Sequence, residues 1–357
     1  MKEWNEKLEA YLEGRISLEE LKNARARPRL LAKVRVVKGG LRFEPATEQD
    51  NDRLWKALEK LKWIWGDQDI PTELMPYYDD RNVWVLLYGF DKWFKLFNPR
   101  QLLTLVKLVK LIREAGKRVE EEKLREGWSK EEAHKYAEAV TTYLAMAVVR
   151  FVDHNNIITL LHPSDPIGIE IAHALSMRGL AMQWNWGDTN PFIVVRGILR
   201  TNSFVKCLEK EIEGLEYLIN AVSGSASRVR VLLDDATTLS KLSGEKFDVI
   251  ITDPPYRDDV PYAELSDFYY VWLKRALSDD NLALRFHKDA LIYNTQWEQF
   301  ARYEVSYNAS RLNYFHIEEA GDYYEKLLGM AFDRMSELLK DDGLLVTYFA
   351  HSSPQAW

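Results

Sequence analysis

The sequence predicts an α/β protein in which a parallel sheet near the C-terminus follows a large, mostly helical N-terminal region. Two observations carry this prediction. From residue 228 onward, apolar and β-branched runs alternate with helical patterns in the order strand, strand, helix, helix, strand, and such alternation is typical of a parallel sheet. Residues 98–153 instead carry two long apolar patterns with helical spacing. We therefore expect three consecutive parts, 1–97, 98–200 and 201–357.

The first part combines short helices with a β-hairpin. Met1–Asn23 favours one or two short polar helices, and Ala24–Phe43 favours a hairpin that turns at Gly39-Gly40. Asn82–Phe90 is expected to form a strand. The hairpin region is basic, and its charges are as consistent with contacts to phosphate groups as with a solvated face. They are Arg25, Arg27, Arg29, Lys33, Arg35 and Lys38.

The second part is predicted to be mainly helical. Asn98 is a suitable N-cap, with Pro99 at the first helical position. The loop Met182–Phe192 combines aromatic with polar side chains, which is more typical of a functional loop than of a core. The expected helices of this part are Pro99 to about Leu124, Ser129 to about Asp153, and Gly168–Leu180.

The third part contains the alternating elements of the expected sheet. Its strands are rich in β-branched residues, and its helices carry aromatic and apolar faces. The expected elements are the helix Ser203–Val222, the strands Arg228–Leu233 and Phe247–Thr252, the helices Tyr262–Leu277 and Tyr323–Leu339, a turn at Asp341-Asp342-Gly343, and the strand Leu344–Phe349.

The tetrapeptide Asp253-Pro254-Pro255-Tyr256 is the most informative feature of the chain. It leaves the C-terminal end of a predicted buried strand, where open α/β sheets bind their ligands. A carboxylate and a backbone carbonyl can both accept hydrogen bonds from an amino group and so favour its attack as a nucleophile. Two prolines stiffen the loop, and the tyrosine ring can stack on a base. The alternative is a proline-rich turn without chemistry.

The bulk composition excludes several classes of protein. The net charge of −7 does not indicate a general nucleic-acid binder, so any such surface must be local. A single cysteine, Cys207, excludes an internal disulfide and a zinc site built from cysteines. The histidines show no metal-ligand spacing, and no metal is expected. Neither a membrane span nor a signal peptide is recognisable. We expect a cytoplasmic protein. Its abundant Lys and Glu residues weakly favour a thermophilic source.

The tetrapeptide and its surroundings resemble the amino-methyltransferase branch of the S-adenosylmethionine-dependent Rossmann-like enzymes. The longer string from Asp253 to Arg275 is similar to large archaeal and bacterial adenine-specific DNA methylases, some of which contain a zinc ribbon and a domain of unknown function. The resemblance extends over about 82–357. Its further segments are Tyr88-Gly89-Phe90, Phe97–Leu102, Trp184–Phe192, Tyr323-Tyr324, Phe349-Ala350-His351 and Ala356-Trp357.

This resemblance implies a partial Rossmann-like sheet and an enzyme that methylates the exocyclic amine of adenine in DNA, with the target base flipped out of the duplex. Two alternatives stay open: an RNA base methyltransferase, and an inactive nucleic-acid-binding or assembly subunit. The implied catalytic residues are Asp253, Pro254, Pro255 and Tyr256. The implied cofactor contacts are Asp235, Ala236 and Asp253, although Asp235 is as readily a turn cap. The implied substrate contacts are Tyr256, Arg257, Tyr262, Asp267, Asn190, Pro191 and Phe192. For Tyr262 the alternative is packing within a buried aromatic helix, and Arg257 can instead pair with Asp258.

Two elements of that family are not recognisable in the sequence. One is the glycine-rich loop that holds the methionine part of the cofactor, and the other is the zinc ribbon. The resemblance therefore implies that a separate polypeptide supplies the cofactor-binding loop and that the chain works as one subunit of a complex.

Overall fold

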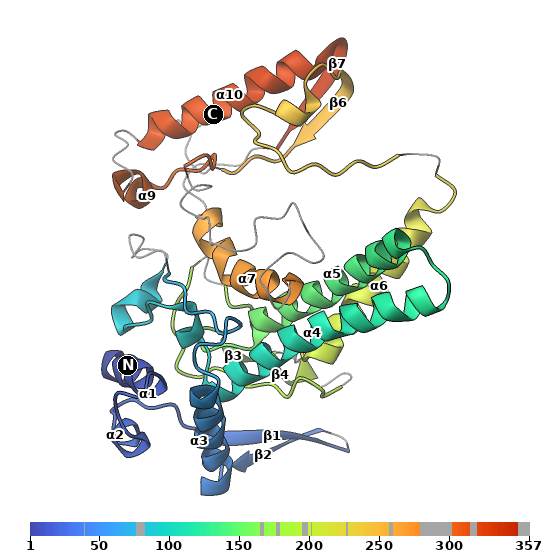
Figure 1. Cartoon of the computed structure of the whole chain (residues 1–357). Coiled ribbons are helices and arrows are strands. Elements are labelled where there is room, and N and C mark those ends of the chain that lie inside the picture. The colour runs from blue at the N-terminus through green and yellow to red at the C-terminus, as the bar shows by residue number, and fades with distance from the viewer. Residues whose placement is uncertain are drawn as a thin grey trace. The chain divides into compact units, whose positions relative to one another are not determined.

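The chain is a mixed α/β protein that divides into two compact units (Figure 1). The computed structural model describes residues 1–38, 40–75, 83–164, 168–175, 179–194, 199–200, 202–225, 228–256, 260–278, 302–314 and 320–348. Unit 1 comprises Met1–Ala221 with Leu265–Thr295, and unit 2 comprises Val222–Glu264 with Gln296–Trp357. This division differs from the three consecutive parts expected from the sequence. The first two parts fall together in unit 1, and two segments of the last part, 201–221 and 265–295, belong with them.

Unit 1 begins with the short helices and the hairpin that the sequence predicts. The helices α2 and α3 each start with a capping box, in which Ser17 pairs with Glu20 and Thr47 with Asp50. The hairpin strands pair antiparallel, with Val37 opposite Gly40; Gly39 lies outside the described residues. The elements are α1 (Lys2–Leu12), α2 (Leu18–Lys22), β1 (Ala32–Val37), β2 (Gly40–Pro45) and α3 (Glu48–Trp63).

Two long helices form the centre of unit 1, as the apolar spacing predicts. They are α4 (Pro99–Arg125) and α5 (Lys130–His154), and they lie side by side (Figure 1). Asn98 caps α4 and Ser129 caps α5, each within a capping box. Their facing residues are fully or almost fully buried, including Leu105, Val109, Ala137, Ala145 and Val148.

Two sequence predictions in unit 1 are wrong. Residues 84–88 form a 3₁₀ helix, η1 (Trp84–Tyr88), where a strand Asn82–Phe90 was expected; Asn82 itself lies outside the described residues. A short apolar run does not distinguish strand from helix, and here Gly89, with φ of 81°, ends the helical turn. A second 3₁₀ helix, η2 (Trp93–Leu96), precedes α4.

The second wrong prediction is the helix expected at Gly168–Leu180. Its first residues form the strand β4 (Gly168–Ile171), which pairs antiparallel with β3 (Leu161–Ser164) and parallel with β5 (Leu199–Arg200). The isoleucines at 169 and 171 alternate with the period of a strand, and β-branched residues suit a strand better than a helix.

The remaining helices of unit 1 are α6 (Phe204–Val222) and most of α7 (Tyr262–Leu277). From Leu265 onward, α7 is a core helix of this unit. Phe268 and Trp272 are fully buried, and both contact Phe97, the first with parallel rings 6.1 Å apart and the second edge-on at 5.3 Å. The aromatic side chains of α7 therefore stabilise the core.

Unit 2 is built on two parallel strands, β6 (Phe247–Thr252) and β7 (Leu339–Thr347). The helix α10 (Ala320–Leu338) leads directly into β7, and α9 (Ala309–Tyr314) and η3 (Ser240–Leu242) complete the unit. Residues 341–343, expected as a turn, lie within β7. The register there shifts from Phe247 opposite Leu339 to Val249 opposite Leu344, which is an irregularity of the bulge type.

The strand expected at Arg228–Leu233 is also wrong: the segment pairs with no strand among the described residues. Its apolar side chains are exposed, with Val229 at 84%, Val231 at 89% and Leu233 at 78%. A β-branched sequence forms a strand only where a neighbouring strand accepts its backbone hydrogen bonds. Across the described part of the chain, no helix combines the length and the apolarity that crossing a membrane requires.

Candidate catalytic site

The loop Asp253–Tyr256 leaves the C-terminal end of β6, as the sequence predicts. Thr252 stands opposite Thr347 of β7, and the ladder continues one step further because the Tyr348 amide donates to the Thr252 carbonyl at 3.0 Å. Pro254 and Pro255 carry no N–H and cannot continue it. The two parallel strands therefore end at the same edge, and the tetrapeptide begins there.

A second tyrosine anchors this loop from α10. The hydroxyl of Tyr324 donates to the Pro255 carbonyl at 3.0 Å, and Tyr324 is only 3% exposed. Its ring belongs to a small apolar cluster with Val305 and Leu327. Since Tyr324 is buried and packed, it holds the Pro255 carbonyl in one position. Tyr324 belongs to one of the segments that carry the resemblance. No local sequence pattern indicates its hydrogen bond to a residue 69 positions earlier in the chain.

The loop presents its chemical groups at the surface. The Asp253 side chain is exposed, whereas Tyr256 is half-buried. The Tyr256 hydroxyl donates to Asp253 Oδ1 at 2.9 Å. Among the described residues, nothing donates a hydrogen bond to the carbonyl of Pro254. A carboxylate and a backbone carbonyl are thus available as two adjacent acceptors, the number that the two protons of an amino group need.

Asp235 and Ala236, expected to contact a cofactor, lie in a compact turn of unit 2. Asp235 Oδ1 accepts hydrogen bonds from the Thr237 amide at 2.8 Å and from the Thr237 hydroxyl at 2.7 Å. Asp234 binds the same turn through the Lys241 amide at 2.7 Å, which lowers the pKa of its carboxyl. Asp235 therefore serves as a turn cap, the alternative that the sequence left open.

The remaining described substrate candidates of the third part, Tyr262 and Asp267, belong to different units. Tyr262 is 45% exposed at the first position of α7 and belongs to unit 2. Asp267 belongs to unit 1 and is only 3% exposed, and burial raises the pKa of its carboxyl to about 7. A carboxyl enclosed in this way is part of the interior of unit 1 and does not offer a surface to a base. Arg257 lies outside the described residues.

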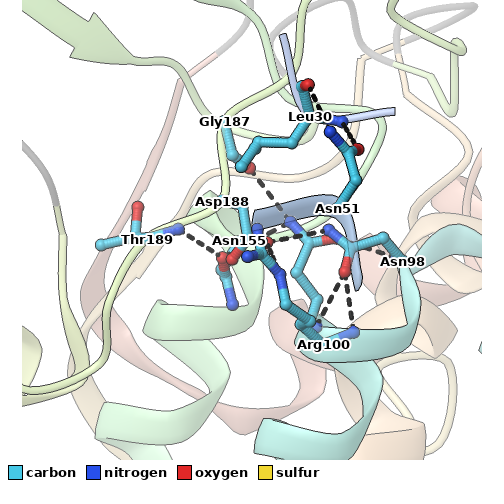
Figure 2. Close-up of polar contacts among 9 residues, drawn as sticks. Leu30, Asn51, Asn98, Arg100, Asn155, Gly187, Asp188 and Thr189 are labelled. Carbon is cyan, nitrogen blue, oxygen red and sulfur yellow. Dashed lines mark hydrogen bonds and ion pairs between the residues drawn. The ribbon is translucent and has the colours of Figure 1, made fainter. Parts of the chain in front are cut away.

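The polar-aromatic loop Trp184–Phe192 belongs to unit 1, where the start of α4 holds it (Figure 2). Asp188 Oδ2 accepts from Asn98 Nδ2 at 3.2 Å and from Arg100 Nε at 3.0 Å. The Gln101 side-chain amide donates to the Gly187 carbonyl at 3.0 Å. A carboxylate at a helix N-terminus beside an arginine is a favourable charge arrangement.

The far side of this loop is fixed by Asn155, whose Oδ1 accepts from the Thr189 amide at 3.1 Å (Figure 2). Figure 2 also shows the separate pair in which Asn51 bonds both backbone groups of Leu30. Because Asp188 already neutralises Arg100 and the start of α4, this end of the helix is not an open anion site.

The substrate candidates Asn190, Pro191 and Phe192 follow at the end of the same loop. Asn190 Oδ1 accepts from the Phe192 amide at 3.0 Å, and the Val205 amide donates to the Pro191 carbonyl at 3.2 Å. Phe192 is 67% exposed and Trp184 is 72% exposed. The loop is therefore held by several hydrogen bonds and presents two aromatic rings to solvent.

Three of the six basic residues of the hairpin region form ion pairs within unit 1. Lys33 contacts Asp50 at 2.7 Å, Arg35 contacts Glu44 at 3.0 Å, and Arg29 lies 3.4 Å from Glu48. Paired surface charges of this kind favour the solvated face over a phosphate-contacting patch.

Comparison with known proteins identifies no relative, because no family model, no curated protein and no solved structure matches the chain.

Proposed function

We propose that the chain is the catalytic-loop subunit of a split S-adenosylmethionine-dependent methyltransferase that acts on the exocyclic amine of adenine in DNA. The observation that carries this proposal is the loop Asp253–Tyr256 at the C-terminal end of the parallel strand β6. It combines an exposed carboxylate, a carbonyl acceptor and an aromatic ring on a support fixed by Tyr324.

The role of the acceptors follows from the electronic structure of the substrate. The lone pair of an adenine amine is delocalised into the ring, so the amine is a poor nucleophile. Asp253 and the Pro254 carbonyl would accept hydrogen bonds from the two N–H groups of the amine and stabilise the tetrahedral nitrogen that attacks a methyl group. As the nitrogen gains positive charge, the carboxylate of Asp253 stabilises it and then takes up the departing proton for release to solvent.

Tyr256 would hold the flipped base through its ring. Stacking of a base on an aromatic side chain contributes about 1–3 kcal/mol and depends on the ring face. Before substrate binds, the Tyr256 hydroxyl occupies Asp253 Oδ1. An incoming amine therefore replaces or shares this hydrogen bond. Until then, the hydrogen bond from Tyr256 orients the carboxylate of Asp253.

S-adenosylmethionine would supply an electrophilic methyl group, but the described residues of unit 2 offer only part of a pocket for it. No strand among them is followed by a glycine-rich loop that could approach such a cofactor closely. We infer that a partner polypeptide contributes this loop.

The state of the segment 228–233 supports the same inference. In a doubly wound sheet, strands numbered along the chain lie side by side in the order 3-2-1-4-5. Strands 4 and 5 are therefore neighbours, whereas strands 2 and 1 lie between strand 3 and strand 4. The pair β6 and β7 fits positions 4 and 5. The strand-like sequence 228–233 fits position 3, and it would have no neighbour until strands 1 and 2 are supplied. Its unpaired, exposed state is the expected result.

The surface of β6 and β7 supports it as well. Val249 is 51% exposed, Ile251 67% and Leu344 59%. Parallel strands are normally covered on both faces and flanked on both edges. We infer that the partner completes the sheet on the free side of β6 and that further elements then cover these side chains.

A methyl-transfer assay on the complex tests the proposal. The chain is purified with the polypeptide that restores cofactor binding, and labelled S-adenosylmethionine is supplied with duplex DNA, single-stranded DNA or structured RNA. Mass spectrometry of the digested product then identifies the modified base. N6-methyladenine in DNA supports the proposal, and a modified base in RNA alone supports the second substrate class. A complex that binds cofactor and nucleic acid without transfer supports an inactive binding subunit.

A further inference from the structure

A cluster at the C-terminal end of α5 has the composition of a metal site. Asp153 and His154 are the last residues of this helix, and His173 follows β4. One ligand atom from each of the three side chains lies within 4.8 Å of the other two. All three residues belong to unit 1. The cluster is thus a local feature that does not depend on the proposed function.

His154 is oriented as a metal ligand. Its Nδ1 lies 3.0 Å from the carbonyl oxygen of Ile171, which can only accept, so Nδ1 carries the proton and Nε2 presents a lone pair. The residue is 3% exposed, and Nε2 has no hydrogen-bond partner among the described residues. A buried nitrogen without a partner is costly in a folded protein.

The carboxylate of Asp153 is oriented by two donors. Its Oδ1 accepts from the Tyr269 hydroxyl at 2.8 Å and from the Ala174 amide at 3.1 Å. Its Oδ2 is thereby directed at the two imidazoles: it contacts His173 Nδ1 and lies 3.6 Å from His154 Nε2. Such outer hydrogen bonds are the usual support of metal ligands.

We propose that Asp153, His154 and His173 bind one divalent first-row transition metal ion, with the lone pair of His154 Nε2, His173 Nδ1 and Asp153 Oδ2 as ligands. In a tetrahedral zinc site, bonds of about 2.1 Å separate neighbouring ligands by roughly 3.4 Å. The 3.6 Å between His154 and Asp153 already matches this value. His173, whose side chain is 67% exposed, has the freedom to adjust.

The chemistry of the ligands selects the class of ion. Two imidazoles and one carboxylate suit Zn²⁺ or Fe²⁺ and disfavour Mg²⁺ and Ca²⁺, which prefer oxygen ligands. The C-terminus of α5 adds a favourable negative partial charge. Three protein ligands leave at least one position for water or another molecule, and the exposed side of His173 is where it would enter.

Zinc titration of the full-length chain tests this proposal. The chain is stripped with a chelator, dialysed, and titrated with ZnCl₂ in a calorimeter, and Co²⁺ absorption in the visible range provides a second readout. We expect one equivalent per chain with a saturable isotherm and the intense bands of tetrahedral cobalt. His173→Ala should weaken binding by at least about 100-fold. Because His173 is exposed, this variant should keep the melting temperature of the metal-free chain.

Two further variants separate the ligands from their support. Asp153→Asn keeps the size of the side chain and should also abolish tight binding. Tyr269→Phe removes only the donor to Asp153 and should weaken binding by about 10-fold, as expected for a positioning residue. His134→Ala is the control, since His134 lies on the same helix beside Glu120.

Two results would overturn the metal site. One is the absence of saturable binding by the unmodified chain. The other is equal binding by the unmodified chain and by His173→Ala, which would leave the cluster as an ion pair between His173 and Asp153 beside a buried histidine.

Discussion

The hydroxyl of Tyr256 donates a hydrogen bond to the carboxylate of Asp253 at 2.9 Å, within the loop that follows β6. This contact joins the two side chains that the proposed mechanism uses for different purposes. Asp253 acts on the amine through its oxygens, and Tyr256 acts on the base through its ring. The two roles can be separated by experiment because they depend on different atoms.

Substitutions of Tyr256 test the stacking role. Tyr256→Phe keeps the ring and loses the hydrogen bond to Asp253, so methyl transfer should fall only mildly. Tyr256→Ala removes the stacking surface, which contributes about 1–3 kcal/mol, and should lower kcat/KM by one to two orders of magnitude. Tyr217→Ala, at a 73% exposed tyrosine of α6, is the control. If the Phe variant is as impaired as the Ala variant, the hydroxyl is the essential group.

The pH dependence of stability tests the interior position of Asp267. Burial raises the pKa of its carboxyl from 3.8 to about 7 in the folded chain. Between pH 4 and pH 7 the unfolded chain therefore loses a proton that the folded chain retains, and the contribution of Asp267 to stability falls as the pH rises.

Asp267→Asn carries no such titration. The free energy of unfolding of this variant, relative to the unmodified chain, should increase from pH 4 to pH 7 by up to about 4 kcal/mol. Urea unfolding at several pH values measures it. Asp52→Asn, at an exposed carboxylate of α3, controls for the loss of one negative charge. A difference for Asp267→Asn that is constant with pH would place the carboxyl in contact with water.

The buried ion pair between Arg311 and Glu264 is predicted to stabilise unit 2. Arg311 Nε lies 2.7 Å from Glu264 Oε1, and the two side chains are 2% and 0% exposed. Arg311→Ala leaves Glu264 buried without this partner and should cost about 3–5 kcal/mol of unfolding free energy. Arg118→Ala, at an exposed pair with Glu114, should change stability by less than about 1 kcal/mol. Urea unfolding compares the two, and equal effects would contradict the prediction.

The proposed division of the enzyme between two polypeptides predicts weak cofactor binding by the isolated chain. Calorimetric titration should detect no micromolar affinity for S-adenosylmethionine until the partner polypeptide is added, and the isolated chain should self-associate through its exposed strand edge. Micromolar binding by the isolated monomer would mean that the chain contains its own cofactor loop, and the inference of a partner would then be wrong.

A charge on the unpaired segment tests the same assembly. Val231 is 89% exposed, so Val231→Lys should leave the melting temperature of the isolated chain unchanged. It should prevent assembly with the partner, because the side chain would lie on a face of the completed sheet that helices cover. Val37→Lys, on the exposed hairpin strand β1, should assemble normally. Gel filtration with the partner measures both.

Local chemistry explains which elements could be predicted from the sequence. The starts of α4 and α5 could be predicted from Asn98 and Ser129, because helix capping depends on a few neighbouring residues. The strand β6 and its loop were predictable because a β-branched run ends in two prolines. The prediction of a strand at 228–233 was wrong because a strand also needs a neighbouring strand to bond with. No local sequence pattern guarantees that such a neighbour is present.

The candidate site was predictable only in part, for the same reason. The tetrapeptide is contiguous, whereas its anchor Tyr324 lies 69 residues beyond Pro255. The cluster of Asp153, His154 and His173 has no motif spacing, because a helix end and a strand end bring the ligands together. The resemblance implies Asp267 as a substrate contact, but α7 carries it into the core of unit 1.

Methyl transfer by the complex carrying Asp253→Ala tests the central claim most directly. The unmodified complex is predicted to form N6-methyladenine in DNA. The variant should lose several orders of magnitude in kcat because the amine loses an acceptor of the transition state. Folding should persist, since Asp253 lies exposed on a loop. Asp248→Ala, at an exposed carboxylate of β6, should retain activity. Equal rates of methyl transfer in the unmodified complex and in Asp253→Ala would contradict the account.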